Sequence, residues 1–350
     1  MSIKFSNAAL SGCKTGRFFM PHAPITLSLA VIPLMTGCSL LAPTPEPAPP
    51  QTHYHAPVVE AVSGTAVSIP QLAERLAEQD VVMIGEYHGH QGAHLLQSRL
   101  QAHLYQHRPE QVLSMEQFEV DRQPVLDRYL AGDIGEMELV EDAGAWPIYK
   151  YAYRPLVEFA RRQGLPVIAA NAPGDIVRCV GREGPEYLAG LNAARKRHIP
   201  DAPFAGSAAY REKFFGTMGG RHGTADNERL QNTYHAQLLR DNTMASRILA
   251  ARERHPEHQV IHLTGTFHSE ERLGTVEALL QRNPELSVAV ISPVFMEAQP
   301  DGDELPLTGN QNKGDYLYFL LPLPPEYRDE ARGHESMMDA FRKVPETTCD

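Results

Sequence analysis

The residues best suited to chemistry gather in one stretch, Val81–Gln97, which reads VVMIGEYHGHQGAHLLQ. An apolar run and a glycine lead directly to Glu86 and His88. A carboxylate and an imidazole this close together can transfer protons or bind a metal ion. His90 and His94 follow four residues apart on a predicted helix, so they share a face, either as metal ligands or as a polar stripe satisfied within the protein. We therefore place the centre of the functional site at this turn.

Other polar side chains follow apolar runs of the same kind. Glu116, Asn171 and His268 each stand at or just after the end of a short predicted strand. The carboxyl ends of parallel strands meet at one edge of a sheet, where ligands bind in open α/β folds. We therefore predict that these side chains converge with Glu86 and His88. The alternative for each residue alone is a polar cap on a helix or loop.

Two of the runs end in the same order, a glycine, two residues and a histidine, as GEYH and GTFH. Glycine lets the backbone turn sharply, so the two turns could bring His88 and His268 to one divalent metal ion or one substrate. Glu116 could complete the metal site or act as a base, and Glu86 could take either role. Asp241, within a long predicted helix, is either hydrogen-bonded to this site or exposed to solvent.

Short apolar strands alternate with amphipathic helices between residues 80 and 171. This spacing is typical of βαβ units and predicts an α/β fold with a mainly parallel sheet flanked by helices. Residues 181–226 break the pattern and predict a helical insertion with loops. Later strands are expected at Val260–Leu263, at Ser287–Ile291 and, at an edge of the sheet, at Tyr316–Leu320.

Length and charge limit the possible classes of protein. The 350 residues suffice for one large α/β domain, which we assign to residues 66–325, with residues 326–350 as a loosely ordered tail. The chain carries 43 Asp and Glu against 32 Lys and Arg. Broad nucleic-acid binding needs a basic surface that displaces counterions, so nucleic acid is not an expected partner.

The N-terminus is typical of a bacterial lipoprotein. Basic residues precede the apolar run Ile25–Leu34, which is too short to span a bilayer, and the sequence MTGC ends at Cys38. We predict a signal peptide over residues 1–37 and lipid on Cys38; the alternative is an ordinary signal peptide with an incidental cysteine. Residues 38–65, rich in proline, are expected to form an extended tether at the outer membrane.

Two smaller features belong to the exported part of the chain. Cys179 and Cys349 could pair in an oxidising compartment, or stay apart because the C-terminus is frayed. The HYH tract at residues 53–55 could bind metal, or be a solvated part of the tether. The domain itself is expected in the periplasm or at the cell surface.

Several motifs together resemble the ChaN family of iron-regulated lipoproteins. They are GEYHGHQGAHLLQ, SMEQFEVDRQPVLDRYLAG, VIAANAP, HAQLLRDNTMA and VIHLTGTFHSEERLG, spread in order over roughly residues 75 to 295. The resemblance implies a superfamily shared with Tiki and TraB proteins and erythromycin esterases, and a cleft with His88, His268 and Glu116. It also implies haem binding through tyrosine at a homodimer interface, and a role in iron uptake beside an outer-membrane haem receptor.

The insertion offers the expected surroundings for haem, with aromatic, methionine and basic residues close together. A tyrosine oxygen suits ferric haem. The candidates for the haem site are Tyr210, His222, Tyr234 and His235. The alternative is an amphipathic helix packed on the core.

Two functions from different classes follow from these features. The first is a haem-binding outer-membrane lipoprotein in haem or iron uptake. The second is a metal-dependent hydrolase that uses the GxxH cleft. The two could coexist, because the cleft and the haem surface could be separate.

Overall fold

The computed structural model describes residues 48–222, 227–296, 305–343 and 348–349. The predicted signal peptide and Cys38 lie outside the described residues. Among those described, no helix is both long enough and apolar enough to cross a bilayer.

A single sheet of eight strands forms the centre of the fold, in the order β2-β1-β8-β7-β3-β6-β4-β5. The strands from β8 to β5 in this order are parallel, β1 pairs antiparallel with β8, and β2 pairs antiparallel with β1. This confirms the predicted mainly parallel α/β fold. The strands are β1 Val58–Glu60, β2 Ala66–Val67, β3 Val81–Glu86, β4 Gln111–Glu119, β5 Val167–Asn171, β6 Gln259–Gly265, β7 Val288–Phe295 and β8 Tyr316–Leu320.

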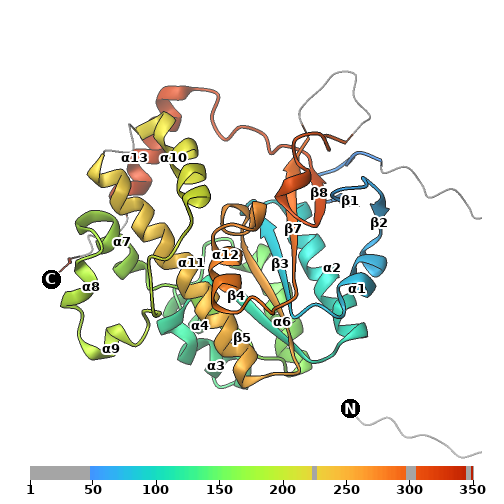
Figure 1. Cartoon of the computed structure of the whole chain (residues 1–350), viewed down its shortest axis with the longest axis horizontal. Coiled ribbons are helices and arrows are strands. Elements are labelled where there is room, and N and C mark those ends of the chain that lie inside the picture. The colour runs from blue at the N-terminus through green and yellow to red at the C-terminus, as the bar shows by residue number, and fades with distance from the viewer. Residues whose placement is uncertain (1–47, 223–226, 297–304, 344–347, 350) are drawn as a thin grey trace, which may run out of the picture. The chain divides into compact units, whose positions relative to one another are not determined.

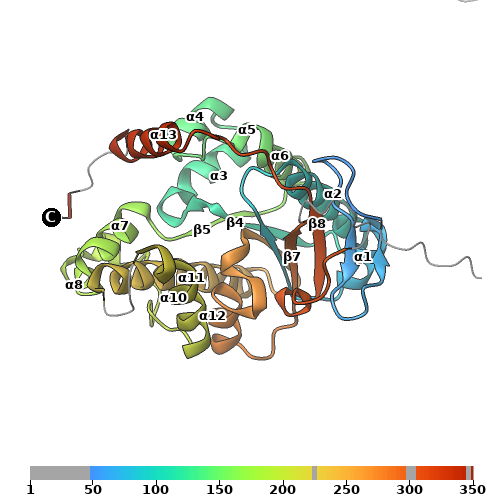
Figure 2. The same ribbon diagram turned by 90° about the horizontal axis from the view of Figure 1, so that it is seen from above.

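Helices cover both faces of the sheet, with α2, α3 and α6 on one side and α11 and α12 on the other (Figures 1 and 2). The first group is α1 Ile69–Leu76, α2 Gln91–His107, α3 Gln123–Ala131, α4 Glu136–Asp142, α5 Tyr149–Ala152 and α6 Arg154–Gln163. The remaining helices are α7 Gly174–Glu183, α8 Tyr187–Gly190, α9 Ala193–Lys196, α10 Ala208–His222, α11 Glu228–Arg254, α12 Thr275–Arg282 and α13 Glu330–Lys343.

The central strand shows why the sequence has continuous apolar runs. In β3, Val82 and Ile84 pack in the core on the α2 side, whereas Val81 and Met83 pack against α11 and α12. A strand covered on both faces is apolar at most of its positions. Side chains at the end of a strand therefore reach the α2 side or the α11 side according to their register.

Both ends of the domain differ from the sequence prediction. Val58 and Val59 of β1 are buried, so the tether predicted for residues 38–65 ends before them. Because β1 pairs with β8, Tyr316–Leu320 is an inner strand and not an edge.

The C-terminal tail also has structure of its own. It contains α13, and the segment before it runs from β8 along the carboxyl edge of the sheet (Figures 1 and 2). A disulfide joins Cys349 to Cys179 of α7, with the two Cα atoms 5.6 Å apart. The tail is therefore fastened to the domain.

Candidate functional site

The first half of the site lies on the α2 side of the sheet, at the end of β3. Glu86 has a fully buried side chain, and Oε1 of its carboxylate lies 2.7 Å from Nδ1 of His88. The hydroxyl of Tyr153 donates to the same oxygen at 2.6 Å, and the amide of Gln97 donates to the other. His88 keeps 42% of its side chain exposed and packs edge-on against Trp146. Glu86 thus fixes an imidazole that remains partly exposed to solvent.

The second half lies on the α11 side, around His268 at the end of η2 Thr266–His268. Nδ1 of His268 is 2.7 Å from Oδ1 of Asp241, and its Nε2 is 3.5 Å from Oε1 of Glu116. The hydroxyl of Thr264 and the amide N–H of Gly265 each donate to Oε2 of Glu116 at 2.7 Å. This imidazole therefore stands between two buried carboxylates.

Gly265 is the place where the two halves meet. A Cβ at this position would lie 2.9 Å from Nε2 of His88 and 3.7 Å from Oε2 of Glu116. Glycine therefore leaves room for the ring of His88 to approach this backbone, and the Glu116 carboxylate lies at ordinary contact distance from the same place. We name Glu86, His88, Glu116, Asp241 and His268 the strand-end site. The sequence pattern had grouped all of them except Asp241, which was left open and comes from α11.

A second glycine supports Asp241. Gly274, with φ of +60°, precedes α12, and a Cβ there would lie 2.9 Å from Oδ1 of Asp241 and 3.1 Å from the hydroxyl of Tyr210. Thr275 donates to Oδ1 and Tyr210 donates to Oδ2. Asp241, which is 1% exposed, is therefore bonded to the site and not exposed to solvent.

The charges of the site shift the pKa of its members. Burial alone would raise the pKa of Glu116, but the neighbouring His268 and His88 and the bonds from Gly265 and Thr264 lower it to about 2. Burial would lower the pKa of His268, and the carboxylates of Asp241 and Glu116 outweigh it, so that the pKa is raised. The pKa of His88 is raised too, because the bond and charge of Glu86 outweigh burial.

The described part of the chain holds no group of three or more His, Cys, Asp or Glu side chains placed to hold a metal ion. The metal-ligand role predicted for His88, Glu116 and His268 therefore has no support. The reason is visible in the contacts, because each imidazole bonds to its own carboxylate on its own face of the sheet.

Asn171 and His90 have partners outside the strand-end site, whereas Nδ1 of His94 lies 3.6 Å from Oε2 of Glu86. Asn171, at the end of β5, accepts a hydrogen bond from Arg240 of α11 and bonds to none of the catalytic candidates in the described contacts. His90 caps α2 and lies 2.9 Å from the backbone oxygen of Leu321, and His94 accepts from the N–H of Gly89. The His90 and His94 pair is thus a satisfied polar stripe.

The predicted haem candidates do not form an open site. Tyr210 is 1% exposed and donates 2.7 Å to Asp241, and burial together with that carboxylate raises its pKa well above 10. Tyr234 is buried as well, which raises its pKa to about 12. His235 is half-buried beside Phe204, and the side chain of His222 lies outside the described residues. Tyr210 and Tyr234 are thus buried in this structure, and their assignment as haem ligands stays a prediction.

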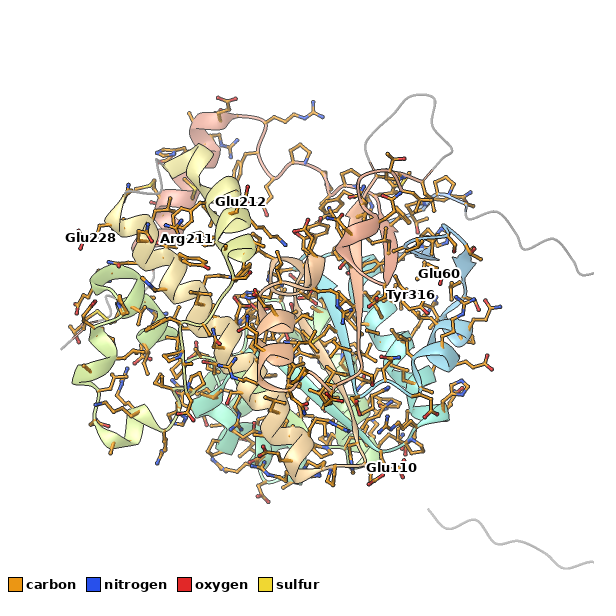
Figure 3. All side chains as sticks on the ribbon, in the orientation of Figure 1. Glu60, Glu110, Arg211, Glu212, Glu228 and Tyr316 are labelled. Carbon is orange, nitrogen blue, oxygen red and sulfur yellow. A yellow bond between two sulfur atoms is a disulfide. The ribbon has the colours of Figure 1, made fainter. Side chains whose placement is uncertain are left out.

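The insertion contains an amphipathic helix packed on the core, which was the alternative to a haem site. The aromatic side chains of α10 and α11 form a compact cluster with Phe267 and Leu273 of the strand-end loop. Their outer side carries Arg211 and Glu212, which are exposed (Figure 3). The amphipathic helix α10 therefore covers the core, and its inner face supports Asp241.

Several supporting residues were not predicted as parts of the site. They hold the carboxylates of Glu86 and Glu116 in place, from α2, β4, the turn between α5 and α6, and β6. No local pattern marks them, because their partners are far away in sequence. They are Gln97, Gln117, Tyr153 and Thr264.

The fold and site define a class of protein: a mainly parallel α/β domain with two histidine–carboxylate pairs at the carboxyl edge of its sheet. The chain belongs to the family described as haem-binding uptake, Tiki superfamily, ChaN, whose sequence profile matches residues 72–279. This confirms the family predicted from the motifs. No curated protein matches the chain significantly.

One solved structure with a TM-score above 0.5 shows the same fold. A structure described as cofacial haem binding to ChaN of Campylobacter jejuni is 15% identical, with a TM-score of 0.56 over 76% of this chain and 97% of that one. An erythromycin esterase mutant in its open conformation is 12% identical, with a TM-score of 0.40 over 77% and 82% of the two chains. At these identities the first similarity shows the fold alone.

Proposed function

We propose that this protein binds haem and serves haem or iron uptake as a lipid-anchored protein of the outer membrane. The observation that carries the proposal is family membership over residues 72–279. The MTGC sequence at Cys38 and the Cys179–Cys349 disulfide support export to an oxidising compartment. A homodimer and an outer-membrane haem receptor as partner belong to the same proposal.

The residues first assigned to haem fit it poorly. A tyrosinate ligand must lose its proton, and burial beside Asp241 strongly disfavours that loss at Tyr210. Haem also needs an open slot with apolar walls. The aromatic cluster of α10 and α11 is packed and leaves no such slot. The haem surface is therefore to be sought outside the cluster formed by α10 and α11.

Titration of the purified full-length chain with haemin tests the proposal. We expect a Soret band that shifts from that of free haemin and saturates, because binding changes the axial ligands and the surroundings of the iron. The same chain unfolded in guanidinium is the control. A spectrum identical to that of haemin in buffer would contradict haem binding.

Replacement of Cys38 by serine tests the anchor. Cys38→Ser should move the protein from the membrane fraction to the soluble fraction, or leave the precursor unprocessed, because the thiol that carries lipid is lost. Cys13→Ser, within the predicted signal peptide, should leave the membrane fraction unchanged. An unchanged membrane fraction in Cys38→Ser would refute the lipoprotein assignment.

A second candidate function is hydrolysis at the strand-end site. Its support is the pair formed by Glu86 and His88: a carboxylate that accepts from Nδ1–H leaves Nε2 as an acceptor, able to take a proton from water. His268 has the same arrangement with Asp241, but both of its ring nitrogens face buried groups. His88 is therefore the better general base.

This candidate predicts a specific pH profile. If His88 is the base, hydrolysis of a simple activated ester should rise with pH through a midpoint above 6.5, because Glu86 raises the imidazole pKa and only the neutral form accepts a proton. His88→Ala should lower the rate about 100-fold or more. His107→Ala, an exposed histidine at the end of α2, is the matched control. Equal rates in the two variants would exclude hydrolysis at this site.

A further inference from the structure

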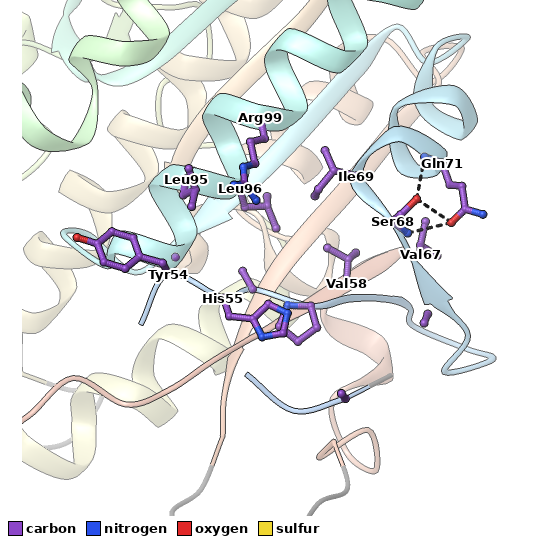
Figure 4. Close-up of a pocket in the computed structure, with 15 residues that line it drawn as sticks. Tyr54, His55, Val58, Val67, Ser68, Ile69, Gln71, Leu95, Leu96 and Arg99 are labelled. Carbon is purple, nitrogen blue, oxygen red and sulfur yellow. Dashed lines mark hydrogen bonds between the residues drawn. The ribbon is translucent and has the colours of Figure 1, made fainter. Parts of the chain in front are cut away.

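A cavity of about 500 Å³ lies between residues 54–69 and helix α2, away from the strand-end site (Figure 4). Its volume falls within the roughly 300–1,000 Å³ of pockets for small molecules and cofactors. Aliphatic side chains form most of its walls, from β1 and β2, from the start of α1 and from the first half of α2. They include Val58, Val67, Ile69, Leu95 and Leu96.

The HYH tract of residues 53–55 forms one side of this cavity and is held to the domain. The N–H of His55 donates to the backbone oxygen of Thr52 at 2.9 Å, and Nε2 of His53 lies 3.2 Å from the backbone oxygen of Pro322. A Cβ on Gly92 would lie 2.8 Å from the backbone oxygen of His53. The tract is therefore a docked turn and not a solvated tether.

The rim of the cavity carries an imidazole, a phenol and a guanidinium. Figure 4 shows the ring of His55 on the side opposite Leu95, Leu96 and Arg99, with Tyr54 at one end. His55, Tyr54 and Arg99 are all exposed to solvent at the rim. The guanidinium of Arg99 lies at this rim and can pair with a carboxylate through charge-assisted hydrogen bonds.

We propose that this cavity binds haem, with His55 as the iron ligand and Arg99 paired with a propionate. The apolar walls suit the macrocycle, and the ring of Tyr54 offers an aromatic face beside it. Imidazole is a common axial ligand of haem iron, and His53 is already engaged by Pro322. The inference rests on the proposed haem function and names an iron ligand, His55, outside residues 72–279, the part that matches the family, whereas Arg99 lies within that part.

Variants of the full-length chain test the site by haemin titration. His55→Ala should change the Soret maximum and weaken haemin binding about 10-fold or more, because the axial ligand is lost. Arg99→Glu should weaken binding by a similar factor and make it depend strongly on ionic strength, since a carboxylate replaces the cation. Ala66→Trp, which fills the cavity from β2, should also reduce binding.

Matched substitutions elsewhere separate this site from the general ability to bind haem. His107→Ala and Arg254→Glu change exposed residues of the same types outside the cavity, and should bind haemin as the wild type does. If all variants bind like the wild type, haem binding stands and this cavity is not its site. If the wild type fails to bind haemin, the proposed function and the site both fail. Binding of palmitate but not haemin in the cavity would also overturn the assignment.

Discussion

Asp241→Ala is expected to lower the free energy of unfolding by about 3–5 kcal/mol, the cost of breaking a buried ion pair on one side. The carboxylate of Asp241 lies 2.7 Å from Nδ1 of His268 and accepts hydrogen bonds from Tyr210 and Thr275. Its removal leaves an imidazole and two hydroxyls buried without these partners. Gly274 lies against this carboxylate and has no side chain that could fill the space left by its removal.

Urea unfolding of the full-length chain measures this effect. Tyr210→Phe removes one of the three bonds and should cost about 1 kcal/mol, the usual net value of a hydrogen bond. Asp142→Ala, an exposed aspartate on α4, should be nearly neutral. If Asp241→Ala is as stable as Asp142→Ala, the contacts around Asp241 do not hold the insertion to the sheet.

The sequence allowed a good prediction of the strands because most of them are covered on both faces. A run such as Val81–Ile84 must be apolar throughout, and its polar successors must lie at the sheet edge. The order of neighbours does not follow from such runs. The adjacency of β3 and β6, which brings the two GxxH turns together, comes from the sheet topology.

The split of the site between two faces could not be predicted. Glu86 continues the alternation of β3 and faces α2, whereas Glu116 faces α11, and the register of β4 shifts between Met115 and Glu119. The apolar residues at the start of β4 do not indicate this register shift. A metal site was expected because the residue types suggested one cluster, and the structure forms two histidine–carboxylate pairs.

The haem candidates show a different limit of the sequence. Aromatic and basic residues alternate along α10. The same pattern occurs in helices that line a ligand slot and in helices that cover a core. Phe214 and Tyr210 are buried against α11, so the pattern marked the inner face of the helix. By contrast, Tyr54 and His55 were assigned to a solvated tether, because nothing local shows that His53 docks on Pro322.

The strongest pH dependence of stability is expected from Glu116. Its pKa is about 2 in the folded protein and 4.5 ordinarily. A depressed pKa gives stability that is fully present above pH 4.5 and is lost as the pH falls from 4.5 toward 2. The difference corresponds to about 3 kcal/mol of stability at neutral pH. Its source is the charge of His268 and His88 together with the bonds from Thr264 and Gly265.

Glu116→Gln removes this dependence while it keeps the size of the side chain. At pH 7 the variant should be about 3 kcal/mol less stable than the wild type, because the carboxylate between the histidines is lost. The difference should shrink as the pH falls from 4.5 to 3, where the wild-type carboxylate begins to bind its proton. Urea unfolding at several pH values measures it, with Glu253→Gln as an exposed control on α11. A gap between the two proteins that stays constant from pH 7 to pH 3 would show that Glu116 acts through packing and not through its charge.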